Sequence, residues 1–309
     1  MLTVLVLPVV TFMERYRVPR WLAILLAVLG VVGAMVTLTA SMARVIQDFT
    51  EALPSYQDRL ALQVESTTAW LAGRGLPEEA LDLSGNLDPN DLMGLVSATL
   101  SSVVDILSNT LLVALMLGFM LFEATSFPRK LSRAFEGGAA WVEQMSQASG
   151  TVQKYLAIKT VISMVTGLLL WGWVSLLGVD FPYLWGLLAF LLNYVPTIGS
   201  IIAAVPPVLV ALVQLGPAYA LGVGLGFLAV NITLGNILEP RLMGRRLGLS
   251  PLVVLLSLVF WGWLWGPAGM LLSVPLTVIA KILLEHHPDT RWVAVMLGPS
   301  EETSPPVAA

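Results

Sequence analysis

The chain has no cysteine, and only two of its 309 residues are histidine. Without cysteine there is no disulfide framework, no thiolate nucleophile and no cysteine-based zinc site. The two histidines are adjacent, at His286 and His287, close to the polar C-terminal tail. Thiol and zinc chemistry are therefore excluded as hypotheses for the function. We predict no metal site and no cofactor.

Charged residues are also scarce. Asp, Glu, Lys and Arg make up 12% of the chain and hydrophobic residues 57%, whereas about 25% of an ordinary soluble domain is charged. Residues 160–238 contain one ionisable Asp, Glu, Lys or Arg, Asp180, and residues 247–280 contain none. Both stretches exceed the roughly 20 apolar residues that cross a bilayer. The composition predicts an all-α polytopic membrane protein whose environment is lipid, with no nucleic-acid partner.

The positive charges are unevenly distributed. Residues 43–100 hold nine Asp and Glu but only three Arg, whereas the other 13 of the 16 Lys and Arg fall into four clusters. Cytoplasmic loops are enriched in Lys and Arg, so we place the clusters in the cytoplasm and residues 43–90 outside. This predicts a multi-pass protein of a bacterial inner membrane with a cytoplasmic C-terminus. The clusters are Arg15, Arg17 and Arg20; Arg129, Lys130, Arg133, Lys154 and Lys159; Arg241, Arg245 and Arg246; and Lys281 with Arg291.

The N-terminal region, residues 1–42, is predicted to hold two membrane helices. The first apolar run, Leu2 to Phe12, has 11 residues and would rise only about 16 Å, so we interpret it as the end of a clipped helix. The first complete span is Trp21 to Met42. Residues 43–90 are predicted to form an external helical segment, because apolar residues recur there at helical spacing. These apolar residues are Ile46, Phe49, Leu53, Tyr56, Leu60 and Val64.

The middle of the chain is predicted to return to the cytoplasm. Residues 91–124 have the length of a long membrane helix whose outer part stands in solvent. Residues 125–151 are basic with interspersed apolar side chains, a pattern typical of an amphipathic helix at the membrane surface. A plain solvated loop is the alternative for this segment. Residues 285–309 are predicted to be a cytoplasmic tail.

Residues 152–284 are predicted to form the transport domain. Spans at Tyr155–Gly178 and Ala218–Leu238 leave the apolar run Tyr183–Val213 with both ends outside, although Pro196 and Gly199 interrupt it. The run Pro251–Ile282 has both ends inside, because Arg and Lys flank it, and its own break is Gly266 to Gly269. Each run is therefore predicted to be a broken-helix hairpin, the first entering from outside and the second from inside.

The two halves of this domain are related by a constant shift. Moving the sequence by 69 residues places Pro182 on Pro251 and Pro206 on Pro275. We therefore predict an inverted repeat, residues 155–213 and 224–282, and about eight membrane segments in total. Broken helices within a membrane persist where they are buried or line a cavity, and paired broken helices in inverted repeats are typical of alternating-access carriers. The alternative is ordinary spans that are merely kinked by proline and glycine.

Few polar residues lie inside the apolar runs, and these few are the candidates for solute contact. Asn193 precedes the first break, and Asn231 and Asn236 lie on the span before Glu239. For each Asn, hydrogen bonding between helices is an equally good explanation. Glu239 and Arg241, at a predicted membrane edge, are interpreted as a paired structural charge rather than a proton carrier, although a coupling role stays open. The candidate substrate-binding residues are Asn193, Pro196, Thr197, Gly199, Asn231, Asn236, Gly266, Pro267 and Gly269.

Four separated motifs occur in a characteristic order. They are NYVPTIG at Asn193–Gly199, EPRLMG at Glu239–Gly244, LGLSPLVVLLSL from Leu247 and GPAGMLLSVP at Gly266–Pro275. With these motifs the sequence resembles the bacterial autoinducer-2 exporter family of permeases over nearly its whole length. It departs from the family pattern in its short start, in Ser250 where a His commonly precedes the proline, and in a Trp-rich WGWLW stretch.

The resemblance implies an inner-membrane protein of eight segments that forms homo-oligomers, with a pentamer as the expectation. It also implies export of autoinducer-2, or exchange of sodium or lithium for protons. The leading hypothesis is thus a carrier for a small polar solute. The alternatives are a monovalent cation/proton antiporter, which needs a titratable group within the membrane, and a non-transporting scaffold that binds partners through residues 43–90. An enzyme is not predicted, because no catalytic constellation falls within the apolar runs.

Overall fold

The computed structural model describes residues 2–72, 138–243, 249–285 and 289–298, together with residues 94, 96, 98–101, 116, 118–121 and 123. This described part of the chain is helical and contains no strand. Five of its helices are long and apolar enough to cross a membrane. The prediction of an all-α polytopic membrane protein is confirmed at this level. The predicted helix at 91–124 and the segment at 125–137 fall largely or wholly outside the described residues.

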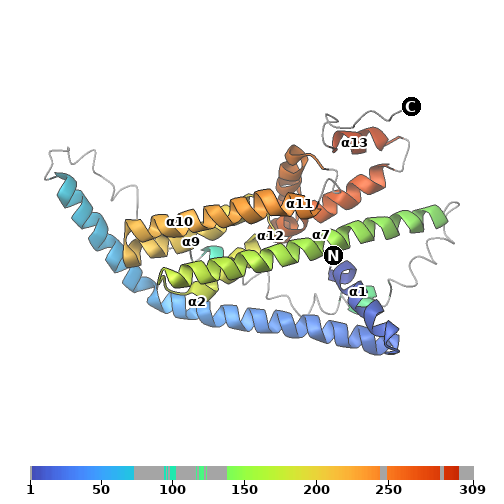
Figure 1. Cartoon of the computed structure of the whole chain (residues 1–309), viewed down its shortest axis with the longest axis horizontal. Helices are drawn as coiled ribbons and strands as arrows, with labels where there is room; N and C mark the ends of the chain where they lie inside the picture. Colours follow the sequence, from blue (N-terminus) through green and yellow to red (C-terminus); the bar gives the residue numbers. More distant parts are fainter. Residues whose placement is uncertain are drawn as a thin grey trace.

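The N-terminal helices α1 (Leu2–Arg15) and α2 (Arg20–Ala72) fold back on one another. Val6 and Val10 of α1 pack against Ile24 of α2. Helix α2 continues without interruption for 53 residues, so the predicted boundary between residues 42 and 43 is not a break in the helix. Figure 1 shows that α2 bends part-way along. Proline removes a backbone hydrogen bond from a helix interior, and Pro54 lies inside α2.

The apolar stripe predicted beyond residue 43 is covered within the same chain. Phe49, Tyr56 and Leu60 are buried in the main hydrophobic core. The ring of Phe49 meets that of Trp185 edge-on, with the ring centres 5.7 Å apart, and Ile46 and Leu53 pack against the same core. The helical periodicity was therefore meaningful, but this stripe is not a free surface for joining copies of the chain.

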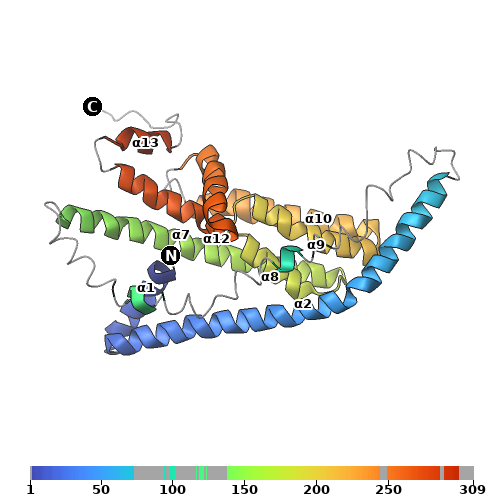
Figure 2. The same ribbon diagram turned by 180° about the vertical axis from the view of Figure 1, so that it is seen from behind.

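The transport region is built around α7 (Gly138–Leu176), which α8 (Pro182–Leu192), α9 (Ile198–Leu215) and α10 (Pro217–Val230) follow. A π-helix, η2 (Asn231–Leu238), continues α10 into α11 (Glu239–Met243). Helix α12 (Pro251–Glu285) and the short α13 (Arg291–Met296) complete the described chain. Helices α7, α9 and α10 run side by side in both views (Figures 1 and 2).

Two broken elements pack on different halves of α7. On its C-terminal half, Leu170 and Val174 share a core with residues of α8. Gly167 of α7 and Gly186 of α8 let these two helices approach so closely that a methyl group at either position would meet the other's carbonyl oxygen. On the N-terminal half of α7, Val152 and Leu156 pack with residues of α12. Helix α7 is thus the common support of both elements.

The helix breaks occur where the sequence predicts interruptions. The run Tyr183–Val213 divides into α8 and α9, and Thr197 between them has a positive φ of 60°. Helix α12 is interrupted at Gly266, whose φ is 62°. Positive φ is strained for a β-branched residue such as threonine but not for glycine. The prolines at 206 and 275 stay inside α9 and α12.

Candidate functional site

One face of α7 carries buried polar side chains in an otherwise apolar span. Lys159, Ser163 and Thr166 are four and three residues apart, so they lie on the same side of the helix. All three are buried, and they account for three of the seven buried polar or charged residues in the described part of the chain. Buried polar groups are expensive unless they have partners, so we traced the partners of each.

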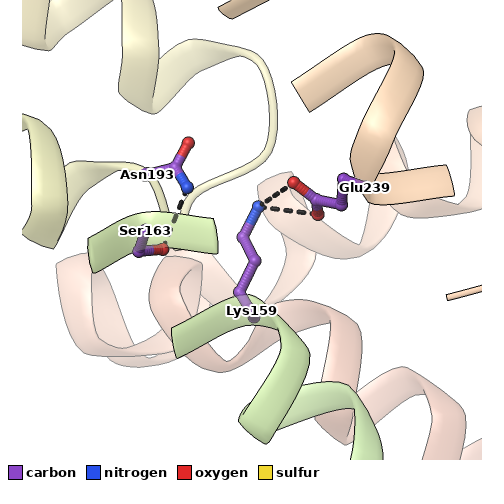
Figure 3. A network of polar contacts seen from close by, with 4 residues as sticks. All are labelled: Lys159, Ser163, Asn193 and Glu239. Carbon is purple, nitrogen blue, oxygen red and sulfur yellow. Dashed lines mark hydrogen bonds and ion pairs between the residues drawn. The ribbon is translucent and has the colours of Figure 1, made fainter. Parts of the chain in front are cut away.

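Two hydrogen bonds tie the break between α8 and α9 to this face of α7. The amide nitrogen of Asn193, the residue that ends α8, donates to Ser163 Oγ at 2.9 Å, as Figure 3 shows. The Tyr194 hydroxyl donates to Thr160 Oγ1 at 2.8 Å. Asn193 therefore makes a helix-to-helix hydrogen bond, one of the two roles that its sequence position left open.

A small pocket lies beside the break, where α7, α8, α9 and the junction of α10 with η2 meet. Its enclosed part has room for about one water molecule. The Thr166 hydroxyl is buried and has no hydrogen-bond partner. The polar lining thus combines two predicted residues, Asn193 and Asn231, with Thr166 and Ser200. The full lining is Thr166, Leu170, Ala189, Asn193, Ser200, Ala203, Phe227 and Asn231.

An ion pair lies at the other end of the polar face. Lys159 Nζ is 2.7 Å from Glu239 Oε1 and 2.8 Å from Oε2 (Figure 3). The Lys159 side chain is 4% exposed and that of Glu239 17%. The predicted pairing of Glu239 with Arg241 is therefore wrong. In the structure the acid turns toward α7, while Arg241 is exposed.

The π-helix connects the pocket to this ion pair. It begins at Asn231, which lines the pocket, and ends at Leu238, next to Glu239. The Glu239 backbone N–H donates to the carbonyl of Leu234, five residues earlier, as π-helical geometry requires. Short π-helical turns inside α-helices are frequent at functional sites. The pocket and the ion pair are thus two ends of one irregular segment.

The other predicted site residues are divided between the two breaks. Pro196, Thr197 and Gly199 lie in the break between α8 and α9, where Gly199 sits directly against the Leu192 carbonyl. Gly266, Pro267 and Gly269 lie at the interruption of α12 and do not line the pocket. Asn236 is exposed on η2.

Sequence analysis missed Ser163 and Thr166, and it assigned Lys159 to a cytoplasmic charge cluster. The available signal was their helical spacing on one span.

Residues 1–289 match the sequence profile of the AI-2E family transporter. The chain belongs to the AI-2E transporter family. This confirms the resemblance on which the motifs were identified. The AI-2 transport protein TqsA of Escherichia coli K12 is 43% identical over 96% of this chain and 86% of its own length. "Putative transport protein YhhT" of the same strain is 37% identical over 96% of this chain and 85% of its own length.

Membership of the AI-2E family agrees with the helices described above. A transporter family and five apolar helices of spanning length together make this a multi-pass membrane protein. A transport protein of Haemophilus influenzae, 38% identical over 96% of the chain, has the same kind of description. The relatives are transport proteins, in agreement with a function other than catalysis.

Proposed function

We propose that this member of the AI-2E family carries a small polar solute, such as autoinducer-2, across the membrane by alternating access. The observation that carries the proposal is the pocket beside the α8–α9 break. It places the amides of Asn193 and Asn231 and the Thr166 hydroxyl around one space within apolar helices. Irregular backbone at membrane depth is expected where it lines a cavity. The name of TqsA supplies autoinducer-2 as the first solute to test.

An inverted repeat supports the alternating-access part of the proposal. The two positive-φ residues, Thr197 and Gly266, are 69 residues apart, as are the first residues of α8 and α12, Pro182 and Pro251. This is the shift at which the sequence halves correspond. Agreement in backbone geometry, independent of residue type, favours a repeat over unrelated kinks.

Close glycine contacts at both breaks add to this support. A side chain at Gly199 would overlap the Leu192 carbonyl, and one at Gly269 would overlap the Trp261 carbonyl. Leu192 and Trp261 are again 69 residues apart. The two broken elements also pack on opposite halves of α7. Hairpins that enter a bilayer from opposite sides would be arranged in this way.

The test is transport of radiolabelled autoinducer-2 into and out of proteoliposomes, comparing wild type with Asn193→Ala and Gly199→Leu. We expect both variants to assemble and to lose most of the solute flux. Thr37→Ala on α2, where the hydroxyl is exposed and bonded to its own helix, is the matched control and should transport normally. Normal flux in assembled Asn193→Ala would contradict the proposed site. No flux in well-folded wild type would favour the scaffold hypothesis.

A second candidate function is exchange of sodium or lithium for protons. The observation that favours it is the Lys159–Glu239 pair, which places an acid and a base among helices of spanning length. A pH-sensitive dye inside the same proteoliposomes, followed during sodium or lithium pulses, tests this function. Proton movement that disappears in Glu239→Gln, without autoinducer-2 flux, would favour the antiporter over the solute carrier.

We further propose that the protein is a homo-oligomer with a cytoplasmic C-terminus. The family resemblance supports this assembly, with five copies as the expectation. Native mass spectrometry from nanodiscs tests the number of copies. A protease added to inverted or right-side-out membrane vesicles tests the side on which the C-terminal tail lies.

A further inference from the structure

The Thr166 hydroxyl is a buried polar group with no assigned role. Its oxygen is one of three buried side-chain atoms without a hydrogen-bond partner in the described part of the chain. The residue is only 7% exposed and lines the pocket. Leaving such a group unpaired costs about 1–3 kcal/mol, and an unpaired group in a native structure calls for an explanation. A ligand group in the pocket would supply the missing partner.

The amide of Asn193 is held so that its oxygen is left for the pocket. Its nitrogen donates to Ser163 Oγ at 2.9 Å, and Figure 3 shows the amide oxygen turned away from Ser163. Ser163 itself is fully buried. Because an amide oxygen only accepts hydrogen bonds, this arrangement presents an acceptor to the pocket. The Thr166 hydroxyl beside it can donate or accept.

No charged group faces this acceptor. Among the described residues that line the pocket none is ionisable, and the nearest cation on the same face of α7, Lys159, is bonded to both oxygens of Glu239. An ion moved into such surroundings without a counter-charge loses far more solvation energy than a neutral hydroxyl does. The enclosed space has room for about one water molecule, which is the size of one hydroxyl group.

We propose that Thr166 and Asn193 together bind a hydroxyl group of an uncharged solute, and that Ser163 is the positioning residue for Asn193. The selected class is therefore neutral, hydroxyl-bearing molecules, and charged molecules of the same size are rejected. This inference rests on the proposed function, because it assigns the solute contacts of the same pocket. It adds two residues of α7 that the sequence motifs do not include.

The first experiment measures charge selectivity. Purified protein is loaded with radiolabelled autoinducer-2 in a scintillation proximity assay. It is then challenged with three competitors of matched size: ribitol, which is neutral; ribonate, an anion; and 1-amino-1-deoxyribitol, a cation. We expect ribitol to compete at least tenfold better than either charged compound. Equal competition by all three would overturn the proposal.

The second experiment removes single groups from the pocket. Thr166→Val keeps the shape but deletes the hydroxyl, and should weaken autoinducer-2 binding about tenfold, whereas Thr166→Ser should bind like wild type. Thr37→Val on α2 is the matched control, because its hydroxyl is bonded to its own helix. Unchanged binding by assembled Thr166→Val would overturn the proposal. If that variant fails to assemble, Thr166→Ala takes its place with the same expected result.

A third comparison separates positioning from mere packing. Ser163→Ala should weaken binding severalfold without abolishing assembly. Asn193→Asp places a carboxylate in the pocket and should make 1-amino-1-deoxyribitol the strongest of the three competitors. A purely structural role for Asn193 predicts no such reversal of charge preference, so an unchanged order of competitors would count against solute contact.

Binding and flux together distinguish this inference from the proposed function. Binding that depends on Thr166, in a wild type that shows no flux, would refute transport but leave the site in place. Flux in wild type that is identical in Thr166→Val, with unchanged binding, would refute the site but leave transport in place. A folded wild type with neither binding nor flux would overturn both.

Discussion

The ion pair between Lys159 and Glu239 yields the sharpest quantitative prediction. Removing Glu239 leaves a lysine that is 4% exposed without a counter-charge. Deleting one partner of a buried ion pair typically costs about 3–5 kcal/mol, because the remaining charge stays desolvated. We therefore expect Glu239→Ala to lower the free energy of unfolding by about 3 kcal/mol or more, with the lower value reflecting the 17% exposure of the acid. Lys159→Ala should cost a similar amount.

The double variant Lys159→Met/Glu239→Leu should behave differently. It replaces both charges by apolar groups of similar volume, a change that is often neutral or stabilising by about 1–4 kcal/mol. The assay is equilibrium unfolding in mixed micelles, monitored by tryptophan fluorescence. A double-mutant cycle with Lys159→Ala, Glu239→Ala and their combination gives the coupling energy, expected at about 2–3 kcal/mol.

Two results would refute this reasoning. One is a cost below about 1 kcal/mol for each single substitution, with simple additivity in the double variant, which is the behaviour of exposed ion pairs. The other is a Met/Leu variant that is as unstable as either single variant. Each would show that the charges are hydrated in the folded protein.

Three further substitutions test the breaks and the outer contacts of the bundle. Thr197→Gly removes the strain of a positive φ and should raise the free energy of unfolding by up to about 1 kcal/mol. Gly199→Ala forces a methyl group onto the Leu192 carbonyl and should lower it by about 1–3 kcal/mol. Tyr56→Phe loses the 2.6 Å hydrogen bond to Asp180 and should cost about 1 kcal/mol, because the exposed carboxylate regains water. All three are measured by the micelle unfolding assay.

Controls for these substitutions are available in the same helices. Tyr183→Phe removes a hydroxyl that lies 3.3 Å from Ser41 Oγ at an exposed position, so it should leave the stability unchanged. A Tyr183→Phe effect as large as that of Tyr56→Phe would mean that loss of any hydroxyl destabilises the bundle. Gly172→Ala, whose added methyl group meets nothing within 4 Å, serves the same purpose for Gly199→Ala.

Much of the architecture could be predicted because membrane helices are long, apolar and interrupted by distinctive residues. Pro182 and Pro251 are the first residues of α8 and α12, as expected for proline at a helix start. The interruption at Gly266 was also expected. The positive φ of the first break, however, falls on Thr197 rather than on the nearby Gly199, because Gly199 is needed for close approach to a carbonyl. Residue type alone does not separate these two uses of glycine.

The site was harder to predict than the fold. Asn193 and Asn231 stood out because amides are rare in apolar runs, and both line the pocket. Ser163 and Thr166 did not stand out, since hydroxyl groups on membrane helices commonly bond to their own backbone. Lys159 was assigned by its position at the end of a span, and its partner Glu239 is 80 residues away. The π-helix that brings Glu239 to Lys159 has no signature in hydrophobic periodicity.

The uninterrupted helix α2 has a mechanical consequence. Its 53 residues correspond to about 80 Å at 1.5 Å per residue, against a hydrocarbon thickness of about 30 Å. Phe49 and Tyr56 fasten its middle to the core that contains α8 and α9. A lever about 50 Å long that swings by about 10° moves its tip by about 9 Å. Small rearrangements around the pocket would therefore be amplified into displacements at Ala72 that are large enough for spin-label distance measurements.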